Sequence, residues 1–243
     1  MHIIKLDATP STNQYLKHMV LEREMEDYTM VTTNNQTNGR GQMGAGWITQ
    51  EGKNLTVSIL KKFEALKASE QVYLNCAVSL ALYDTLMMLS VPELKVKWPN
   101  DIMSGNKKLC GILIENILQG NFISKSVIGI GLNVNQLDFG DLKNATSIRL
   151  LLGKTINLDA LTNQIVICLK NRLNILETNR FKKIKSTYEQ VLYRKDTPST
   201  FQDKNSNVFM GLIRGVSDDG KLVIQKEDEK LFEFALKEIR LLN

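Results

Sequence analysis

The stretch KLCGILIENILQGNFISKSVIGIGLNVN, residues 108–135, decides the fold of this chain. Its two halves, KLCGILIENIL (108–118) and FISKSVIGIGLNVN (122–135), are β-like apolar runs on either side of Gln119-Gly120-Asn121. Two such runs around a short turn that contains glycine predict a β-hairpin. Shorter strands are expected at residues 3–7, 28–33, 54–60 and 94–98, and Pro99 ends the last of them.

Helical patterns lie between and after these strands. The segment ATPSTNQYLKHMVLE (8–22) predicts a helix that Ser11 or Thr12 can cap. Residues 68–89 are too long and too apolar for anything but a buried helix, and residues 158–190 are also helical in pattern. Strands and helices in this order predict an α/β (α+β) fold with a mixed sheet.

The C-terminal part of the chain has a different sequence pattern. From about residue 193 short β-like runs alternate with turns, and Asp219-Gly220 is a hairpin signal. We expect a large domain over residues 1–192 and a small β-barrel-like domain over residues 193–243. No repeat and no low-complexity segment interrupts this division.

The composition excludes several classes of protein. With 243 residues, 43% of them hydrophobic and 23% charged, the chain is expected to bury an ordinary core. It has no apolar run of 18 residues and no signal peptide, and its three cysteines are widely spaced, so we expect a cytoplasmic protein with reduced thiols and no membrane contact. The net charge of +5 is mild.

Histidine is scarce. Only His2 and His18 occur, which argues against a zinc site and against nucleophile systems that need a histidine base. An enzyme with this composition is expected to work through electrostatics and positioning, with a nucleophile that the substrate supplies.

The segment GRGQMG (39–44) matches G-x-G-x-x-G, the spacing of dinucleotide-binding loops. Such a loop needs a helix after the glycines, whereas the residues after Gly44 lead into a strand. A P-loop is also excluded, because Ala45 stands where its lysine belongs. Two interpretations remain: a mobile hairpin connection, or a loop that orders over an anionic ligand with help from Arg40.

Four motifs occur in a characteristic order: STNQYLK (11–17), QTNGRGQMGAGW (36–47), KWPNDIMSGNKKLCGILIEN (97–116) and IGIGLNVN (128–135). With them, most of residues 1–150 resembles the biotin–protein ligases, and GVSDDGKLVI resembles the small SH3-like C-terminal domain of that family. The resemblance implies a mixed-sheet catalytic domain like those of class II aminoacyl-tRNA synthetases and lipoate ligases. Some members carry an N-terminal helix-turn-helix; since Met1 lies only ten residues before the STN motif, we expect none here and no DNA binding.

The resemblance also implies a two-step reaction. The carboxylate of biotin attacks the α-phosphorus of ATP, with Mg²⁺, to give biotinyl-5′-adenylate and pyrophosphate. A lysine of the biotin carboxyl carrier domain of a carboxylase then takes up the biotin and releases AMP. Alternatives are a lipoate or other acyl ligase of the same superfamily, and a biotin-sensing DNA-binding or interaction protein. Dimers are common in the family, so a homodimer is left open, with the 122–135 strand as an open edge.

Residue roles carried over from the family fall into three groups, and the metal ligands stay unassigned. The catalytic group is Lys108, Arg40 and Asp101. The biotin-binding group is Ser11, Thr12, Asn13, Gln36, Gly39, Arg40, Lys108, Gly111, Gly129 and Gly131. The group that contacts ATP or the adenylate is Arg40, Gln42, Trp47, Asn100, Lys108 and Asn133.

Several of these residues have a second interpretation. Ser11 and Thr12 can serve as helix caps alone, and the three glycines of the hairpin as ordinary bulges. Asp101 could steer the acceptor lysine, help to hold Mg²⁺, or simply belong to a turn. Trp47 could stack on adenine or anchor the end of its loop, and Trp98 is expected in the core or the pocket wall. Lys107 is expected to be solvated, in contrast to Lys108.

The chain departs from the family pattern in the glycine loop. That loop is often GRGRxGRxW, and here Gln42, Met43 and Ala45 stand at positions that are frequently basic. Each missing arginine removes a phosphate contact. We therefore expect the adenylate to be held more loosely and to leak.

Overall fold

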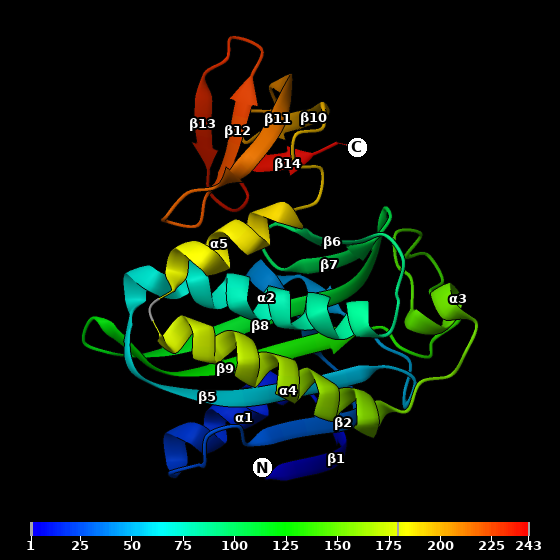
Figure 1. The fold of residues 1–243 in the computed structure, drawn as a ribbon. Helices are drawn as coiled ribbons and strands as arrows, with labels where there is room; N and C mark the ends of the chain where they lie inside the picture. Colours follow the sequence, from blue (N-terminus) through cyan, green and yellow to red (C-terminus); the bar gives the residue numbers. More distant parts are fainter. Residues whose placement is uncertain (1, 179, 243) are drawn as a thin grey trace.

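The computed structural model describes residues 2–178 and 180–242. Its largest element is a seven-stranded sheet in the order β1-β2-β5-β9-β8-β7-β6 (Figure 1). The strands are β1 (Ile3–Thr9), β2 (Met30–Gln36), β5 (Leu55–Lys67), β6 (Leu94–Lys97), β7 (Asp101–Ser104), β8 (Lys107–Gln119) and β9 (Phe122–Leu132). Only β1 and β2 pair in parallel, so the sheet is mixed, as expected.

Strands β8 and β9 form the predicted hairpin. Gly120 lies in its turn with a φ of 60°, a left-handed conformation that glycine adopts without strain. The expectation that the 122–135 strand is an open edge is wrong, because β9 pairs with β5 on one side and β8 on the other. Residues 126–132 are all buried, which is typical of a strand in the middle of a covered sheet.

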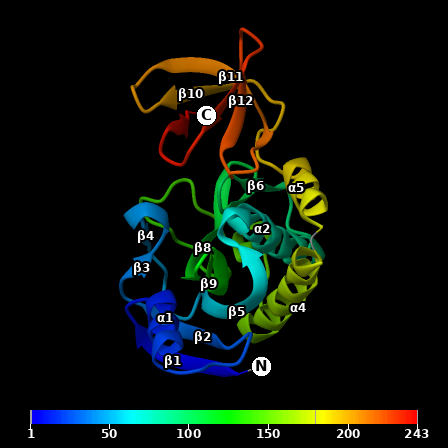
Figure 2. The same ribbon diagram turned by 90° about the vertical axis from the view of Figure 1, so that its left-hand side faces the viewer.

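Helices cover both faces of the sheet. Helices α2 (Gln71–Met88) and α4 (Leu158–Glu177) pack on one face, with α5 (Phe181–Gln190) beside α2 (Figure 2). Helix α1 (Thr12–Glu22) lies on the opposite face, where Leu16 and Val20 pack against Val31, Leu60 and Val127. The helical pattern of residues 158–190 is thus divided between α4 and α5; Asn179 lies outside the described residues. A short helix, α3 (Ile148–Leu152), follows the hairpin.

A second sheet follows α5 along the chain. It is antiparallel, in the order β13-β12-β11-β10-β14. Its strands are β10 (Ser199–Asp203), β11 (Val208–Val216), β12 (Leu222–Lys226), β13 (Leu231–Phe234) and β14 (Ile239–Leu241). Phe201, Ile213 and Ile224 form its interior, and the predicted Asp219-Gly220 turn joins β11 to β12. This arrangement agrees with the expected SH3-like fold.

The glycine-rich loop forms a small hairpin of its own. Strands β3 (Gly39–Arg40) and β4 (Gly46–Trp47) pair, with a 3₁₀ turn, η1 (Gln42–Gly44), between them. The next regular element is β5, so the predicted absence of a helix after the glycines is confirmed. A second 3₁₀ turn, η2 (Ala68–Glu70), leads into α2. Within residues 2–178 and 180–242, no helix has the length and apolar character needed to cross a membrane.

Candidate active site

A cavity of about 240 Å³ lies where the start of α1, the glycine loop and the β8–β9 hairpin meet. All of the predicted site residues line it except Gly39 and Asn133. Those that do are Ser11, Thr12, Asn13, Gln36, Arg40, Gln42, Trp47, Asn100, Asp101, Lys108, Gly111, Gly129 and Gly131. Segments that are up to 120 residues apart in sequence thus converge on one site.

A second cavity of about 760 Å³ adjoins the first. Asn133 lines it, and Trp47, Asp101 and Lys108 line both cavities. Gly39 lies behind the first cavity, in β3. A Cβ atom at Gly39 would be 2.5 Å from Gln36 Nε2 and would also collide with the carbonyl of Trp47, so only glycine lets β3 approach β4.

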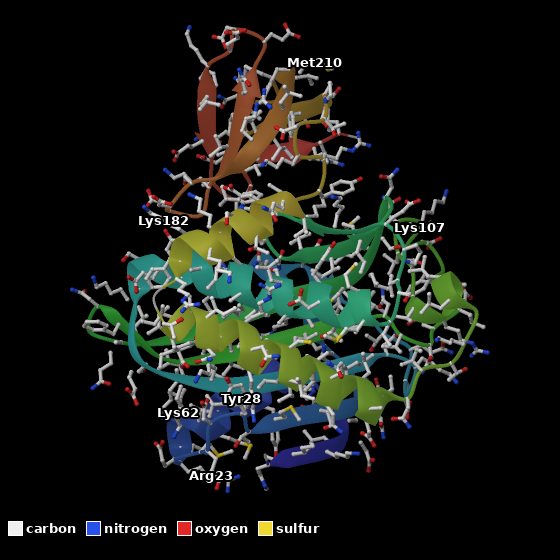
Figure 3. The ribbon with its side chains drawn as sticks, viewed as in Figure 1. Arg23, Tyr28, Lys62, Lys107, Lys182 and Met210 are labelled. Atoms are coloured by element: carbon white, nitrogen blue, oxygen red, sulfur yellow. The ribbon has the colours of Figure 1, made fainter. Side chains whose placement is uncertain are left out.

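Lys108 and Asp101 form an ion pair at the junction of the two cavities. Lys108 Nζ lies 2.8 Å from Asp101 Oδ1 and 5.5 Å from the centre of the Trp47 ring. The side chains of Lys108 and Asp101 are 38% and 24% exposed, so both are half-buried. Lys107 is exposed and points away from the fold, as expected (Figure 3). A cation therefore stands where ligands in the two cavities would meet.

The start of α1 is tied to the end of β2. Ser11 caps the helix, and its Oγ accepts a hydrogen bond from the Gln14 N–H. The Thr12 N–H donates to Gln36 Oε1 over 3.0 Å. Ser11 therefore caps the helix and also lines the cavity, so a rigid helix start forms one end of the cavity.

Asn13 is held by the protein itself. Its Oδ1 accepts from Ser58 Oγ over 2.6 Å, and its Nδ2 donates to the Leu113 carbonyl and to Glu115 Oε2, both over 3.1 Å. Glu115 also pairs with Lys17 at 2.8 Å. Sequence reasoning missed Ser58 and Glu115, although a polar residue inside an apolar strand is a detectable signal.

The three hairpin glycines make room for side chains. A Cβ atom at Gly129 would be 2.8 Å from Asn13 Cγ, and one at Gly131 would be 2.6 Å from Trp47 Nε1. At Gly111 it would be 3.1 Å from Trp47 Cζ3. The bulge interpretation is wrong, because Gly111 pairs with Gly131, and Gly129 with Leu113, in a continuous register. Because these glycines have no Cβ atom, the side chains of Asn13 and Trp47 can pack directly against the hairpin.

The glycine loop presents polar groups to the first cavity. Trp47 lies over Gly131, which agrees with its interpretation as a loop anchor. Trp47 Nε1 and Gln42 Oε1 are buried without a hydrogen-bond partner in the described structure, and such an atom costs about 1–3 kcal/mol. Arg40 is exposed and forms no ion pair within the described residues. The side chain of Met43 lies outside the described residues.

Asn100 and Asn133 hold backbone in place. Asn100 donates its side-chain amide to the Ile112 carbonyl, and its own carbonyl accepts the Ile112 N–H over 3.0 Å. The Asn133 N–H donates to the Leu109 carbonyl. Leu236, in the loop after β13, also lines the first cavity, and no feature of the sequence indicated it.

The thiols of Cys110 and Cys76 are buried and inert. Burial raises the pKa of Cys110 well above its usual range and raises the pKa of Cys76 to about 12. Both thiols therefore stay protonated at neutral pH, and no thiolate nucleophile adjoins Lys108. Cys168 is likewise buried and free. Among the described residues, no three His, Cys, Asp or Glu side chains cluster as metal ligands would.

Known proteins resemble this chain over most of its length. Residues 6–133 match the model of the biotin/lipoate A/B protein ligase family. The bifunctional ligase/repressor BirA of Bacillus spizizenii is 32% identical over 232 residues, which are 93% of this chain and 70% of that relative. A biotin–[acetyl-CoA-carboxylase] ligase of Mycobacterium tuberculosis is 32% identical over 143 residues, 58% of this chain and 52% of its own.

Solved structures agree with these relatives. The biotin protein ligase of Aquifex aeolicus in complex with biotin and ATP superposes with a TM-score of 0.80 at 26% identity. The match covers 99% of this chain and 98% of that one, so it includes both sheets. By its family match, its relatives and its fold, the chain belongs to the biotin/lipoate A/B protein ligase family and is a biotin ligase enzyme.

Proposed function

We propose that this chain joins biotin to ATP as biotinyl-5′-AMP and then transfers biotin to a lysine of a biotin carboxyl carrier domain. The observation that carries this proposal is the position of Lys108 at the junction of two cavities. Biotin occupies the first cavity, with its ring system near Ser11, Thr12 and Gln36. The nucleotide occupies the second, beside Asn133.

The first step brings two anions together at Lys108. A carboxylate oxygen of biotin attacks the α-phosphorus, and the bond to pyrophosphate breaks. The ammonium of Lys108 offsets the repulsion between the two anions and the charge that develops on phosphorus. Arg40, which is exposed and free of ion pairs in the described structure, adds a second cation when the loop closes over the ligand.

The second step needs no nucleophile from the enzyme. The acceptor lysine attacks the acyl carbon, the bond to AMP breaks, and an amide forms as the amine loses its proton. Asp101, beside Lys108, supplies a carboxylate to guide that amine. We propose that residues 1–192 carry both steps and that residues 193–243 form the C-terminal domain.

Mg²⁺ accompanies ATP in this proposal. Asp101 is the carboxylate in the lining of the first cavity, and one carboxylate together with phosphate oxygens is an ordinary magnesium environment. When bound, the ion neutralises charge on the triphosphate.

The test is transfer of labelled biotin to a purified carrier domain with ATP and Mg²⁺. We expect labelling that requires ATP and that is absent when the acceptor lysine of the carrier is replaced by arginine. A parallel reaction with lipoate separates the two branches of the family. If lipoyl-AMP forms and biotinyl-AMP does not, or if the carrier stays unlabelled, the proposed function is wrong.

Glu115→Ala is expected to weaken biotin binding through Asn13. Glu115 accepts one of the two Nδ2 hydrogen bonds of Asn13, and losing a hydrogen bond to a charged group costs about 1.5–3 kcal/mol. The KM for biotin should therefore rise at least tenfold, with little change in kcat. Lys17→Ala is the matched control, since it removes the ion pair with Glu115 and leaves the hydrogen bond between Glu115 and Asn13 in place. An unchanged KM in Glu115→Ala would contradict this role.

Wild-type protein is expected to release biotinyl-AMP into solution when no carrier is present. Gln42 stands where an arginine would contact phosphate, and Gln42→Arg should lower the release about tenfold by adding a charge-assisted contact. The measurement is chromatography of the adenylate in the filtrate, with Gln42→Ala as the neutral control. Retention of one adenylate per wild-type chain would show that the loop holds its intermediate tightly without the extra arginine.

A further inference from the structure

The C-terminal sheet contacts the turn between β6 and β7, which carries Asn100 and leads into Asp101, the first residue of β7. Trp98 follows β6, and its indole Nε1–H donates a hydrogen bond of 2.9 Å to the carbonyl of Gly220, which is 122 residues away in the chain. Trp98 is half-buried at the margin of the core and lines neither of the two cavities. Its polar atom therefore serves contact between the two sheets rather than a ligand.

The turn that offers the Gly220 carbonyl is stiff. The Gly220 N–H donates to the Ser217 carbonyl over 3.0 Å, and the Ser217 N–H donates to the Lys221 carbonyl over 2.9 Å. Gly220 has a φ of 83°, which glycine adopts readily and other residues do not. The β11–β12 turn thus holds its own shape through backbone hydrogen bonds.

The same turn is fixed on the helices. Asp218 accepts from Lys185 Nζ on α5 at 2.6 Å and from the Tyr73 hydroxyl on α2 at 3.3 Å. A Cβ atom at Gly220 would lie 3.2 Å from Val72, so the turn packs closely on α2. The Gly220 carbonyl is therefore presented at a defined place above the catalytic sheet.

The turn after Trp98 reaches the reacting groups within three residues. Asn100 is hydrogen-bonded to Ile112 of β8, and Asp101 pairs with Lys108 at the junction of the cavities. Asn100 therefore holds one end of the turn and Trp98 the other. Electrostatic catalysis loses rate when a charged group moves by a fraction of an ångström.

We propose that Trp98 is a positioning residue through which the C-terminal sheet fixes residues 98–101, and with them the Asp101–Lys108 pair, for activation of biotin. This inference rests on the proposed function. Leu236, in the loop between β13 and β14, adds a second point of contact, because it lines the first cavity. The proposed ring-binding end of that cavity is lined by residues at the start of α1 and the end of β2, and Trp98 does not line the cavity. Loss of the Trp98 hydrogen bond therefore slows activation and leaves biotin affinity unchanged.

The experiment is biotin-dependent exchange of pyrophosphate into ATP, measured on the full chain. Trp98→Phe keeps an aromatic ring and removes the N–H, so kcat should fall about fivefold to tenfold, the effect of one hydrogen bond, with the KM for biotin within about twofold of wild type. Gly220→Ala shifts the acceptor from the other sheet and should give the same pattern. Tyr73→Phe removes only the longer of the two side-chain bonds to Asp218; because the Lys185–Asp218 ion pair of 2.6 Å still holds the turn, kcat should stay near the wild-type value.

The outcomes separate the two proposals. Wild type without biotin-dependent exchange would refute the proposed function. Wild type with exchange and Trp98→Phe at the same kcat would refute the positioning role alone. A rise in the KM for biotin that matches the loss of kcat, or Tyr73→Phe behaving like Trp98→Phe, would show general loosening and also refute it. If Trp98→Phe does not fold, Gly220→Ala decides by the same criteria.

Discussion

Lys108→Ala is expected to lower the rate of biotinyl-AMP formation by a factor on the order of 10² to 10³, the effect of removing one electrostatic contact from a transition state. Lys108 Nζ lies 2.8 Å from Asp101 Oδ1 at the junction of the two cavities. Its removal takes away a cation and leaves the half-buried Asp101 carboxylate unpaired, so a neutral ion pair becomes a net negative charge where two anions must meet. The rate is measured by single-turnover formation of biotinyl-AMP.

Lys107→Ala is the matched control. Lys107 is the neighbouring lysine of the same strand, but it is exposed and points to solvent (Figure 3). The Lys107→Ala variant should keep the wild-type rate. Because Lys108 acts mainly on the transition state, the KM for biotin should change little in either variant. A wild-type rate in Lys108→Ala would show that another group supplies the charge, and equal losses in both variants would point to a general effect of net charge.

Local features of the fold could be predicted from the sequence. The β8–β9 hairpin was recognisable because its strands adjoin a turn with glycine, and α2 because it is apolar on all sides. The order of the strands in the sheet could not be predicted from the sequence. Whether β9 lies at an edge or in the middle depends on its pairing with β5, about 65 residues earlier, and residue patterns within one strand do not encode such a partner.

The candidate site, like the fold, could be predicted only in part from the sequence. Motif order indicated which residues converge, and Lys108, Asp101 and Gln36 do line one cavity. The partners of Asn13 were not assigned from the sequence, because they come from distant segments and a polar residue inside a strand does not by itself name its partner. Ser58 and Glu115 reach Asn13 from 45 and 102 residues away. Resemblance thus identified candidate contacts with ligand, and only the structure showed which polar atoms the protein already uses.

Gly129→Ala is expected to lower the free energy of unfolding by about 2–4 kcal/mol, from overpacking and lost hydrogen bonds. The added Cβ would lie 2.8 Å from Asn13 Cγ, nearer still to Oδ1, in a place where both residues are buried. Asn13 cannot turn away without breaking its bonds to Ser58, Leu113 and Glu115. Urea unfolding followed by circular dichroism measures the loss. Gly46→Ala is the control, since a Cβ there meets nothing within 4 Å.

A double-mutant cycle shows whether Asn13 is the cause. Asn13→Ala alone loses three hydrogen bonds, but it also removes the atoms that the new methyl group would strike. If the collision is responsible, Gly129→Ala should cost about 1–3 kcal/mol less in the Asn13→Ala background than in the wild type. Strictly additive losses would mean that Gly129 is required for another reason, such as the conformation of β9. Because Asn13 belongs to the helix start that forms the biotin end of the cavity, Gly129→Ala should also raise the KM for biotin, whereas Gly46→Ala serves as a control for stability only.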